Sequence, residues 1–192
     1  QAMSSAASDV YKRQILARAN IDVLILEKKT KEYVLSRIRA GVLEWNTVEM
    51  LRKNGVGSRM DREGHIHEGT LLSSLNKQFR IDFKNSINKK VMVYGQTEVT
   101  FDLYEELKKY NVKILHEIDD IKISDLKEKI SCVSFKDVKG KLHSANTQFV
   151  IGCDGFHGIS RNHIPSNILK SYEKVYPFGW LGVLSETPPA VS

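Results

Sequence analysis

The apolar run "IDVLILE" at residues 21–27 is the sequence feature that most limits how this chain can fold. The run has the length of one β-strand, and it shows little of the alternation expected of a strand with one solvated face. It is typical of a strand buried on both faces of a parallel sheet. It ends in an acid, Glu27, so the acid lies at the carboxyl end of the predicted strand.

Further helix and strand patterns along the chain indicate an α/β fold. Residues 43–53 predict a helix with apolar residues on one side, closed by Asn54-Gly55. A second helix, capped by Thr97 and ending near Tyr110, has one apolar stripe, so we expect it to pack on a sheet. Strands are predicted at residues 69–75, 79–83, 91–96, 112–118, 130–136, 141–149 and 148–153, the fifth and sixth joined by a hairpin turn. A last strand at residues 175–184 is predicted to enter a second layer or domain.

The length and composition of the chain fit one globular unit. Its 192 residues are 41% hydrophobic, enough for one core in one domain or a domain with an appendage. It has no apolar run of about 18 residues and no secretory signal pattern, so we expect a cytoplasmic protein without a membrane partner. Cys132 and Cys153 lie in apolar, strand-like runs, which predicts buried reduced thiols.

The charged residues do not form a nucleic-acid-binding pattern. The net charge is +6 and the isoelectric point is near 9.2. Outside the cluster of Lys28, Lys29 and Lys31, the lysines are interspersed with acids. Mixed charges of this kind are typical of solvated faces, and no basic platform interleaved with aromatic residues is present. We therefore expect no nucleic-acid partner.

Two combinations of reactive side chains are rejected as sites. Asp154, His157 and Ser160 have the composition of a hydrolase triad, but the sequence indicates no oxyanion hole beside them. His65 and His67 alternate without a third histidine, which is more typical of surface residues than of a metal site. We therefore predict neither hydrolase chemistry nor a bound metal.

Glu27 suggests a nucleotide-binding role, because an acid after a buried strand can accept hydrogen bonds from both hydroxyls of an adenosine ribose. Such a fold needs a glycine-rich turn about 20 residues upstream, where backbone amides hold the pyrophosphate. The window from Ser4 to Gln14 has no glycine. Because "SDVYKRQ" within it looks like a translated sequencing adapter, we expect residues 1–14 to be a non-native leader. Taken alone, Glu27 is better explained as a surface acid.

Five motifs in a fixed order carry more information than any one of them. They are "LEKKTKEYVLSRIRAGVLE", "GHIHEG", "VYGQTEVT", "GCDGFHGISR" and "YPFGWLG". Together they resemble the single-component FAD-dependent aromatic hydroxylases that act on 4-hydroxybenzoate. The resemblance implies a Rossmann-like FAD-binding α/β domain of the glutathione-reductase type with β-hairpin insertions. It divides the chain into an incomplete FAD- and NAD(P)-binding domain at residues 15–174 and the first strand of a substrate domain at residues 175–192.

The resemblance implies a set of FAD-binding residues. Glu27 would bind the adenosine ribose, and Gln96 would hydrogen-bond the cofactor near a helix start. Asp154 and Gly155 lie in a motif that supports FAD in the family. The segment along the flavin and its phosphates comprises Arg37, Ile38, Arg39, Ala40, Gly41 and Val42. Its arginines suit this role, because a planar guanidinium pairs with phosphate oxygens through two hydrogen bonds, although they also fit a solvated loop.

The same resemblance implies binding of NADPH or NADH. Lys28 and Tyr33 match positions that meet the 2′-phosphate of NADPH. His157 is similar to a pyridine-nucleotide contact of the family, and Arg39 would serve both cofactors. Lysine at position 28 replaces a commoner arginine, so the choice between NADPH and NADH stays open.

The activity implied by the resemblance is hydroxylation of 4-hydroxybenzoate to 3,4-dihydroxybenzoate with NAD(P)H and dioxygen, in a homodimer. In the family, the residues that hold the aromatic acid lie in the second half of the chain. We therefore expect this fragment to be inactive, and we assign no catalytic residue. Two alternatives stay open: a non-catalytic nucleotide-binding module, and a flavin monooxygenase with another phenolic substrate.

Overall fold

The structure is a computed structural model, and it describes residues 15–16, 19–37, 41–110, 112–155, 157–179, 181 and 186. Residues 1–14, the expected leader, lie outside the described residues. In chain order the elements are β1 (Leu24–Leu26), α2 (Lys31–Ser36), β2 (Val42–Glu44), α3 (Trp45–Lys53), α4 (Ser58–Glu63), β3 (His65–His67), β4 (Gly69–Ser74), β5 (Lys77–Asp82), α5 (Phe83–Ile87), β6 (Val91–Val93), α6 (Gln96–Leu107), β7 (Lys113–Leu115), β8 (Asp119–Ser124), β9 (Ser131–Lys136), β10 (Leu142–Thr147) and the 3₁₀ helix η1 (Ser160–His163). The predicted α/β class is confirmed.

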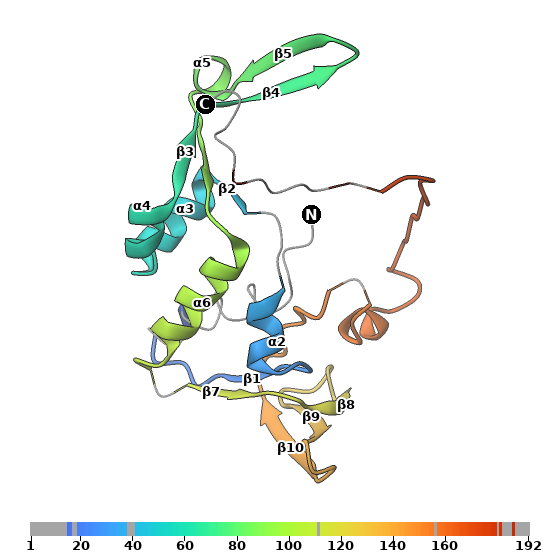
Figure 1. Cartoon of the computed structure of the whole chain (residues 1–192). Helices are drawn as coiled ribbons and strands as arrows, with labels where there is room; N and C mark the ends of the chain where they lie inside the picture. Colours follow the sequence, from blue (N-terminus) through green and yellow to red (C-terminus); the bar gives the residue numbers. More distant parts are fainter. Residues whose placement is uncertain are drawn as a thin grey trace.

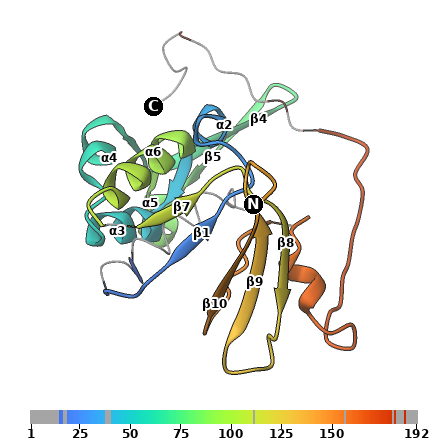
Figure 2. The ribbon, with the colours of Figure 1, turned by 90° about the horizontal axis from the view of Figure 1, so that it is seen from below.

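β1 and β7 form a parallel pair, and they lie side by side in Figures 1 and 2. Leu24 is opposite Lys113, and Leu26 is opposite Leu115. The strand is shorter and less buried than predicted, because within residues 21–27 only Ile25 is buried and Leu24 is 38% exposed. In the described part of the chain β1 pairs with β7 alone, so no described strand pairs with its other edge.

A three-stranded antiparallel sheet in the order β2–β6–β3 carries the main core. β6 is the central strand, and its Met92 is only 1% exposed. Val48 of α3, Met60 of α4 and Leu103 of α6 are buried in the same cluster. Figure 1 shows these three helices gathered beside the sheet. The core therefore fixes both β6 and the helix that follows it.

Two β-insertions project from these elements, as the resemblance implied. β4 and β5 form a hairpin that pairs Gly69 with Asp82 and Ser74 with Lys77, and Figure 1 shows it extending away from the helices. β8, β9 and β10 form an antiparallel sheet, and Figure 2 shows the three strands next to one another. The predicted hairpin turn joins β9 to β10, whereas β8 has no counterpart among the predicted strands.

Several predicted elements are wrong in extent or absent. The helix predicted at residues 43–53 begins at Trp45, because the residues before it belong to β2. Gly95, not Thr97, is the N-cap of α6. The described residues at 148–153, 175–179 and 181 form no strand. An apolar run becomes a strand only where a neighbouring strand takes up its backbone hydrogen bonds, and Phe149 remains 82% exposed.

Truncation of a core residue in α6 tests the packing of this helix on the sheet. We expect Leu103→Ala to lower the free energy of unfolding by about 2–5 kcal/mol, since the side chain is almost fully buried and its loss leaves a cavity. Met50→Ala on the exposed side of α3 is the control, with an expected change below about 0.5 kcal/mol. Urea unfolding followed by circular dichroism measures both, and equal losses would contradict the described core.

Candidate functional site

Glu27 lies directly after β1, at the carboxyl end of the parallel pair. Its amide donates to the carbonyl of Leu115 at 2.8 Å, which continues the pairing by one residue. Its carboxylate oxygen Oε1 accepts a hydrogen bond from the amide of Lys29 at 2.8 Å, so the side chain is held against the loop that follows. The residue is half-buried, which leaves part of the carboxylate open to a ligand.

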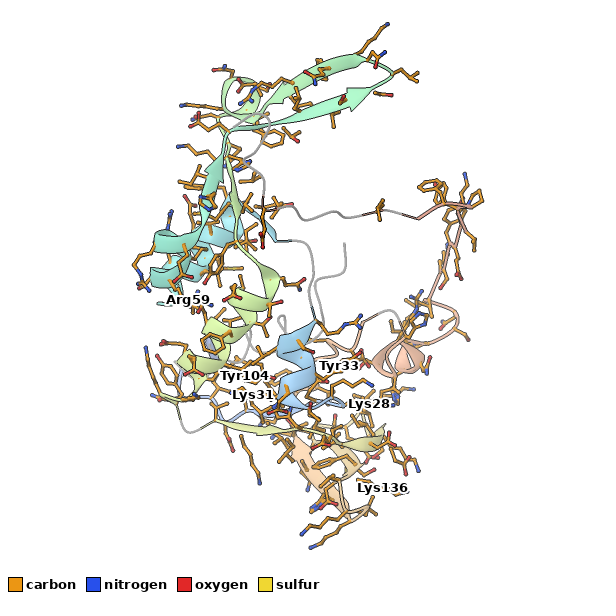
Figure 3. The ribbon with its side chains drawn as sticks, in the orientation of Figure 1. Lys28, Lys31, Tyr33, Arg59, Tyr104 and Lys136 are labelled. Carbon is orange, nitrogen blue, oxygen red and sulfur yellow. The ribbon has the colours of Figure 1, made fainter. Side chains whose placement is uncertain are left out.

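The loop after Glu27 leads into α2, where cationic side chains surround an aromatic ring. The Thr30 hydroxyl oxygen caps α2 by accepting from the amide of Tyr33 at 3.0 Å. Lys29 Nζ lies 5.1 Å and Arg37 Cζ lies 5.6 Å from the centre of the Tyr33 ring. Lys28 Nζ lies 3.6 Å from the carboxylate of Asp119. Figure 3 shows Lys28 and Tyr33 near one another beside α2.

Arg37 and Gly41, which follow α2, are hydrogen-bonded to residues at the start of α6. The amide of Tyr94 donates to the carbonyl of Gly41 at 2.7 Å, and the Thr97 hydroxyl donates to the carbonyl of Arg37 at 3.0 Å. A Cβ atom placed on Gly41 would lie 2.8 Å from the Cα atom of Gly95. The backbones therefore touch where only glycine fits, and Arg37 and Gly41 lie beside Gln96, the first residue of α6.

Four other predicted positions complete this segment. Val42 is the first residue of β2 and its side chain is mostly exposed. Ile38, Arg39 and Ala40 lie outside the described residues.

The motif at Asp154 forms a compact turn of its own. Asp154 Oδ2 accepts a hydrogen bond from the amide of Ser160 at 2.8 Å, at the start of η1. Gly155 has a φ of +73°, and a Cβ on Gly158 would lie 2.0 Å from the Asp154 carboxyl carbon. Among the described residues, the hydrogen bonds of Asp154 stay inside this turn. His157 is exposed within the same turn.

The structure thus brings the predicted residues into three groups. The first contains Glu27, Lys28 and Tyr33, at the end of β1 and in α2. Arg37, Gly41 and Gln96 form the second, which the hydrogen bonds from Thr97 to Arg37 and from Tyr94 to Gly41 hold together. Asp154, Gly155 and His157 share the third. The first two groups follow one another through α2, and no hydrogen bond or ion pair among the described residues joins Asp154 to either.

One polar network beside this site was not predicted from the sequence. Arg59 of α4 binds Asp102 of α6 at 2.7 Å, and Asp102 accepts a hydrogen bond from the Tyr94 hydroxyl at 2.7 Å. Burial and the hydrogen bond to Asp102 raise the pKa of Tyr94, so its phenol stays protonated. Burial disfavours the Arg59 charge, but its hydrogen bonds to Asp102 and Glu98 outweigh burial and raise its pKa. Of Arg59, Asp102 and Tyr94, only Tyr94 lies in a motif singled out in the sequence, "VYGQTEVT", so no sequence pattern indicated its pairing with Asp102 and Arg59.

The described part of the chain shows no metal site, disulfide or membrane-spanning helix. No group of three His, Cys, Asp or Glu side chains there has the geometry to hold a metal ion. Cys132 and Cys153 form no disulfide among the described residues. No described helix is long and apolar enough to cross a bilayer.

The chain carries an FAD-binding domain, as its family shows. Residues 11–192 match the protein family described as "FAD binding domain", and the chain belongs to this family. Its sequence is 39% identical over 177 residues to p-hydroxybenzoate hydroxylase from Acinetobacter baylyi. The match covers 92% of this chain and 43% of that relative, so the chain spans less than half of the relative's length. The predicted family and its cofactor FAD are confirmed.

Solved structures of flavin-dependent enzymes share the fold. PqsL of Pseudomonas aeruginosa in complex with 2-aminobenzoylacetate superposes with a TM-score of 0.74 at 14% identity, over 91% of this chain and 47% of that one. The p-nitrophenol 4-monooxygenase PnpA of Pseudomonas putida gives a TM-score of 0.63 at 15% identity, over 73% and 36%. The flavin-dependent monooxygenase PieE, in complex with FAD and substrate, gives 0.65 at 16% identity, over 80% and 29%. At these identities the likeness establishes the fold.

The contact between Gly41 and Gly95 can be tested by adding one methyl group. We expect Gly41→Ala to cost about 1–3 kcal/mol of folding free energy, because the new Cβ meets backbone atoms that have no side-chain freedom to move. Gly179→Ala is the matched control, since its Cβ would have no neighbour within 4 Å. Thermal unfolding of both variants measures the difference, and a fully stable Gly41→Ala protein would disprove the close approach.

Proposed function

We propose that this chain binds FAD as part of a flavin-dependent aromatic hydroxylase whose substrate is 4-hydroxybenzoate. The observation that carries the proposal is the hydrogen bonding of Arg37 and Gly41 to Thr97 and Tyr94 at the start of α6, with Glu27 at the end of β1, the parallel strand before α2. Membership of the FAD-binding family supports the cofactor, and the name of the Acinetobacter baylyi relative supports the substrate.

The residues present fit FAD by their chemistry. In our proposal the half-buried carboxylate of Glu27 accepts hydrogen bonds from the ribose hydroxyls, while its Oε1 keeps the hydrogen bond from Lys29. The guanidinium of Arg37 pairs with the pyrophosphate, because planar paired donors match phosphate oxygens. A Cβ on Gly41 would lie 2.8 Å from the Cα atom of Gly95, so glycine keeps the two backbones in contact, and Gln96, the residue after Gly95, would hydrogen-bond the flavin.

The nicotinamide cofactor is assigned to the cationic group at α2. Lys28 and Tyr33 bind the 2′-phosphate of NADPH, and His157 contacts the pyridine nucleotide. Lys28 is largely exposed and its partner Asp119 is 3.6 Å away, so a phosphate dianion can compete for the ammonium at little desolvation cost. Asp154 and Gly155 support FAD by shaping the turn before η1.

The reaction proposed for the whole protein consumes 4-hydroxybenzoate, NAD(P)H, a proton and dioxygen, and it yields 3,4-dihydroxybenzoate, NAD(P)⁺ and water. Bound FAD supplies the redox chemistry that links the nicotinamide to dioxygen. The described residues bind and orient the two cofactors. The homologous relative is more than twice as long as this chain, so hydroxylation is assigned to the whole protein and cofactor binding to this chain.

FAD titration of the purified chain tests the proposal directly. We expect saturable binding, followed by flavin fluorescence, and a loss of about tenfold or more in affinity for Glu27→Ala, because two charge-assisted hydrogen bonds to the ribose disappear. Glu32→Ala, an exposed acid in the first turn of α2, is the matched control and should bind as the unmodified chain does. Equal FAD affinity for both variants, or no binding by a folded chain, would reject the proposed site.

The same titration with ADP distinguishes a flavin site from the alternative, a simple nucleotide-binding module. A flavin site should bind FAD much more tightly than ADP, since ADP keeps the ribose and the diphosphate assigned to Glu27 and Arg37 but lacks the flavin assigned to Gln96. Equal affinity for ADP and FAD would favour the module instead.

The assignment of Lys28 predicts a cofactor preference. We expect Lys28→Ala to weaken NADPH binding to the FAD-loaded chain by about tenfold and NADH binding by less than about twofold, because only NADPH carries the 2′-phosphate. Lys77→Ala, in β5, controls for a general loss of positive charge. Calorimetric titration measures the affinity for each nucleotide. An equal loss of affinity for NADPH and NADH would show that Lys28 does not bind the 2′-phosphate.

A further inference from the structure

We propose that Arg59 is a positioning residue of the flavin site, acting through Asp102 and Tyr94 on the backbone of Gly41 and on the first turn of α6. The inference rests on the proposed function, because that function makes Gly41 and Gln96 part of the FAD site. Arg59 itself belongs to α4, and Figure 3 labels it beside α4 and α6.

The guanidinium of Arg59 binds α6 at two levels. Its Nε donates to Asp102 Oδ1 at 2.7 Å, in the second turn of the helix. In the first turn, its NH1 lies 2.5 Å from Glu98 Oε2, and its NH2 donates to the Glu98 carbonyl at 3.2 Å. The rings of Tyr94 and Phe101 lie 5.6 and 5.3 Å from its central carbon. One cation therefore holds the first two turns of α6 against α4, which limits both the shift of α6 along its axis and its rotation about that axis.

Tyr94 connects this network to the cofactor segment. Its hydroxyl donates to Asp102 Oδ2 at 2.7 Å, and its amide donates to the carbonyl of Gly41 at 2.7 Å. The residue is only 5% exposed, so it has little freedom to tilt. A displacement of Asp102 is therefore transmitted through Tyr94 to Gly41 on one side and, through Gly95, to Gln96 on the other.

Loss of the Arg59 charge leaves the network without a counter-charge. Three carboxylates, those of Glu63, Glu98 and Asp102, lie within 4 Å of the guanidinium. Asp102 is mostly buried, with 12% of its side chain exposed. Without Arg59 these like charges repel one another, and the first turn of α6 loses the donor to its Glu98 carbonyl.

A second arginine provides a matched control. Arg52 of α3 binds Asp61 of α4 through Nε and NH2, at 3.0 and 2.8 Å from Oδ1, and it also lies over an aromatic ring, that of Trp45. This pair joins two helices as the Arg59 pair does, but neither residue contacts α6 or Tyr94 in the described interactions. A merely stabilising role for both arginines predicts the same outcome for both variants.

The experiment compares FAD affinity and local backbone exchange in the folded variants. We expect Arg59→Gln to weaken FAD binding by about tenfold and to accelerate amide hydrogen exchange at residues 95–99, whereas Arg52→Gln keeps FAD affinity within about twofold of the unmodified chain. Arg59→Lys should recover part of the affinity, because it restores the charge. Tyr94→Phe removes only the hydroxyl and should show the same direction of change, so it carries the test if Arg59→Gln does not fold.

The outcomes separate this inference from the proposed function. If Glu27→Ala loses FAD while Arg59→Gln and Tyr94→Phe bind it normally, the FAD site stands and the positioning role is overturned. Should the unmodified chain bind no FAD, the proposed function fails, and exchange at residues 95–99 still decides whether Arg59 fixes this turn. Unchanged exchange in both variants would overturn the inference in that case as well.

Discussion

The close approach of Gly41 to Gly95 is the constraint on which the candidate site depends. The Gly41 carbonyl accepts a hydrogen bond from the Tyr94 amide, and a Cβ on Gly41 would lie 2.8 Å from the Cα atom of Gly95, so a side chain at position 41 would block this approach. β2 begins one residue later and pairs with β6, so the same contact sets the start of the central sheet. The buried Met92 in β6 then ties this pairing to the core. A local contact between two backbones thus couples the proposed cofactor segment to the packing of the whole unit.

The two ends of the proposed FAD site are held by different means. At the ribose end, Glu27 depends on the parallel pairing of β1 with β7, where no described strand pairs with the other edge of β1, and on one hydrogen bond from Lys29. Gln96, at the flavin end, depends on a core-packed helix and on a polar network with a largely buried acid. Local opening costs least where buried contacts are few, so the ribose end is the more easily deformed part of the site.

Local patterns in the sequence predicted the elements that depend on near neighbours. The β9–β10 hairpin was predicted, and so were the two strands that pair as β4 and β5, since strands joined by short turns need only each other. Residues 148–153 were predicted as a strand and form none in the described chain, because an apolar run does not show whether a distant strand will pair with it. The Arg59 network was missed for the same reason: Arg59 and Asp102 are 43 residues apart, and each alone resembles an ordinary surface charge.

The network of Arg59, Asp102 and Tyr94 also reduces the repulsion expected between the acidic start of α6 and an anionic cofactor. Glu98 in the first turn of α6 favours the helix, because negative charge complements the positive end of its dipole. The same charge, together with Asp102, would repel the phosphates of FAD. Arg59 pairs with both carboxylates, so its single positive charge offsets part of their field while the helix keeps its first-turn acid. At the proposed site, the backbone amides at the start of α6 and the Arg37 guanidinium would add positive potential toward the cofactor phosphates.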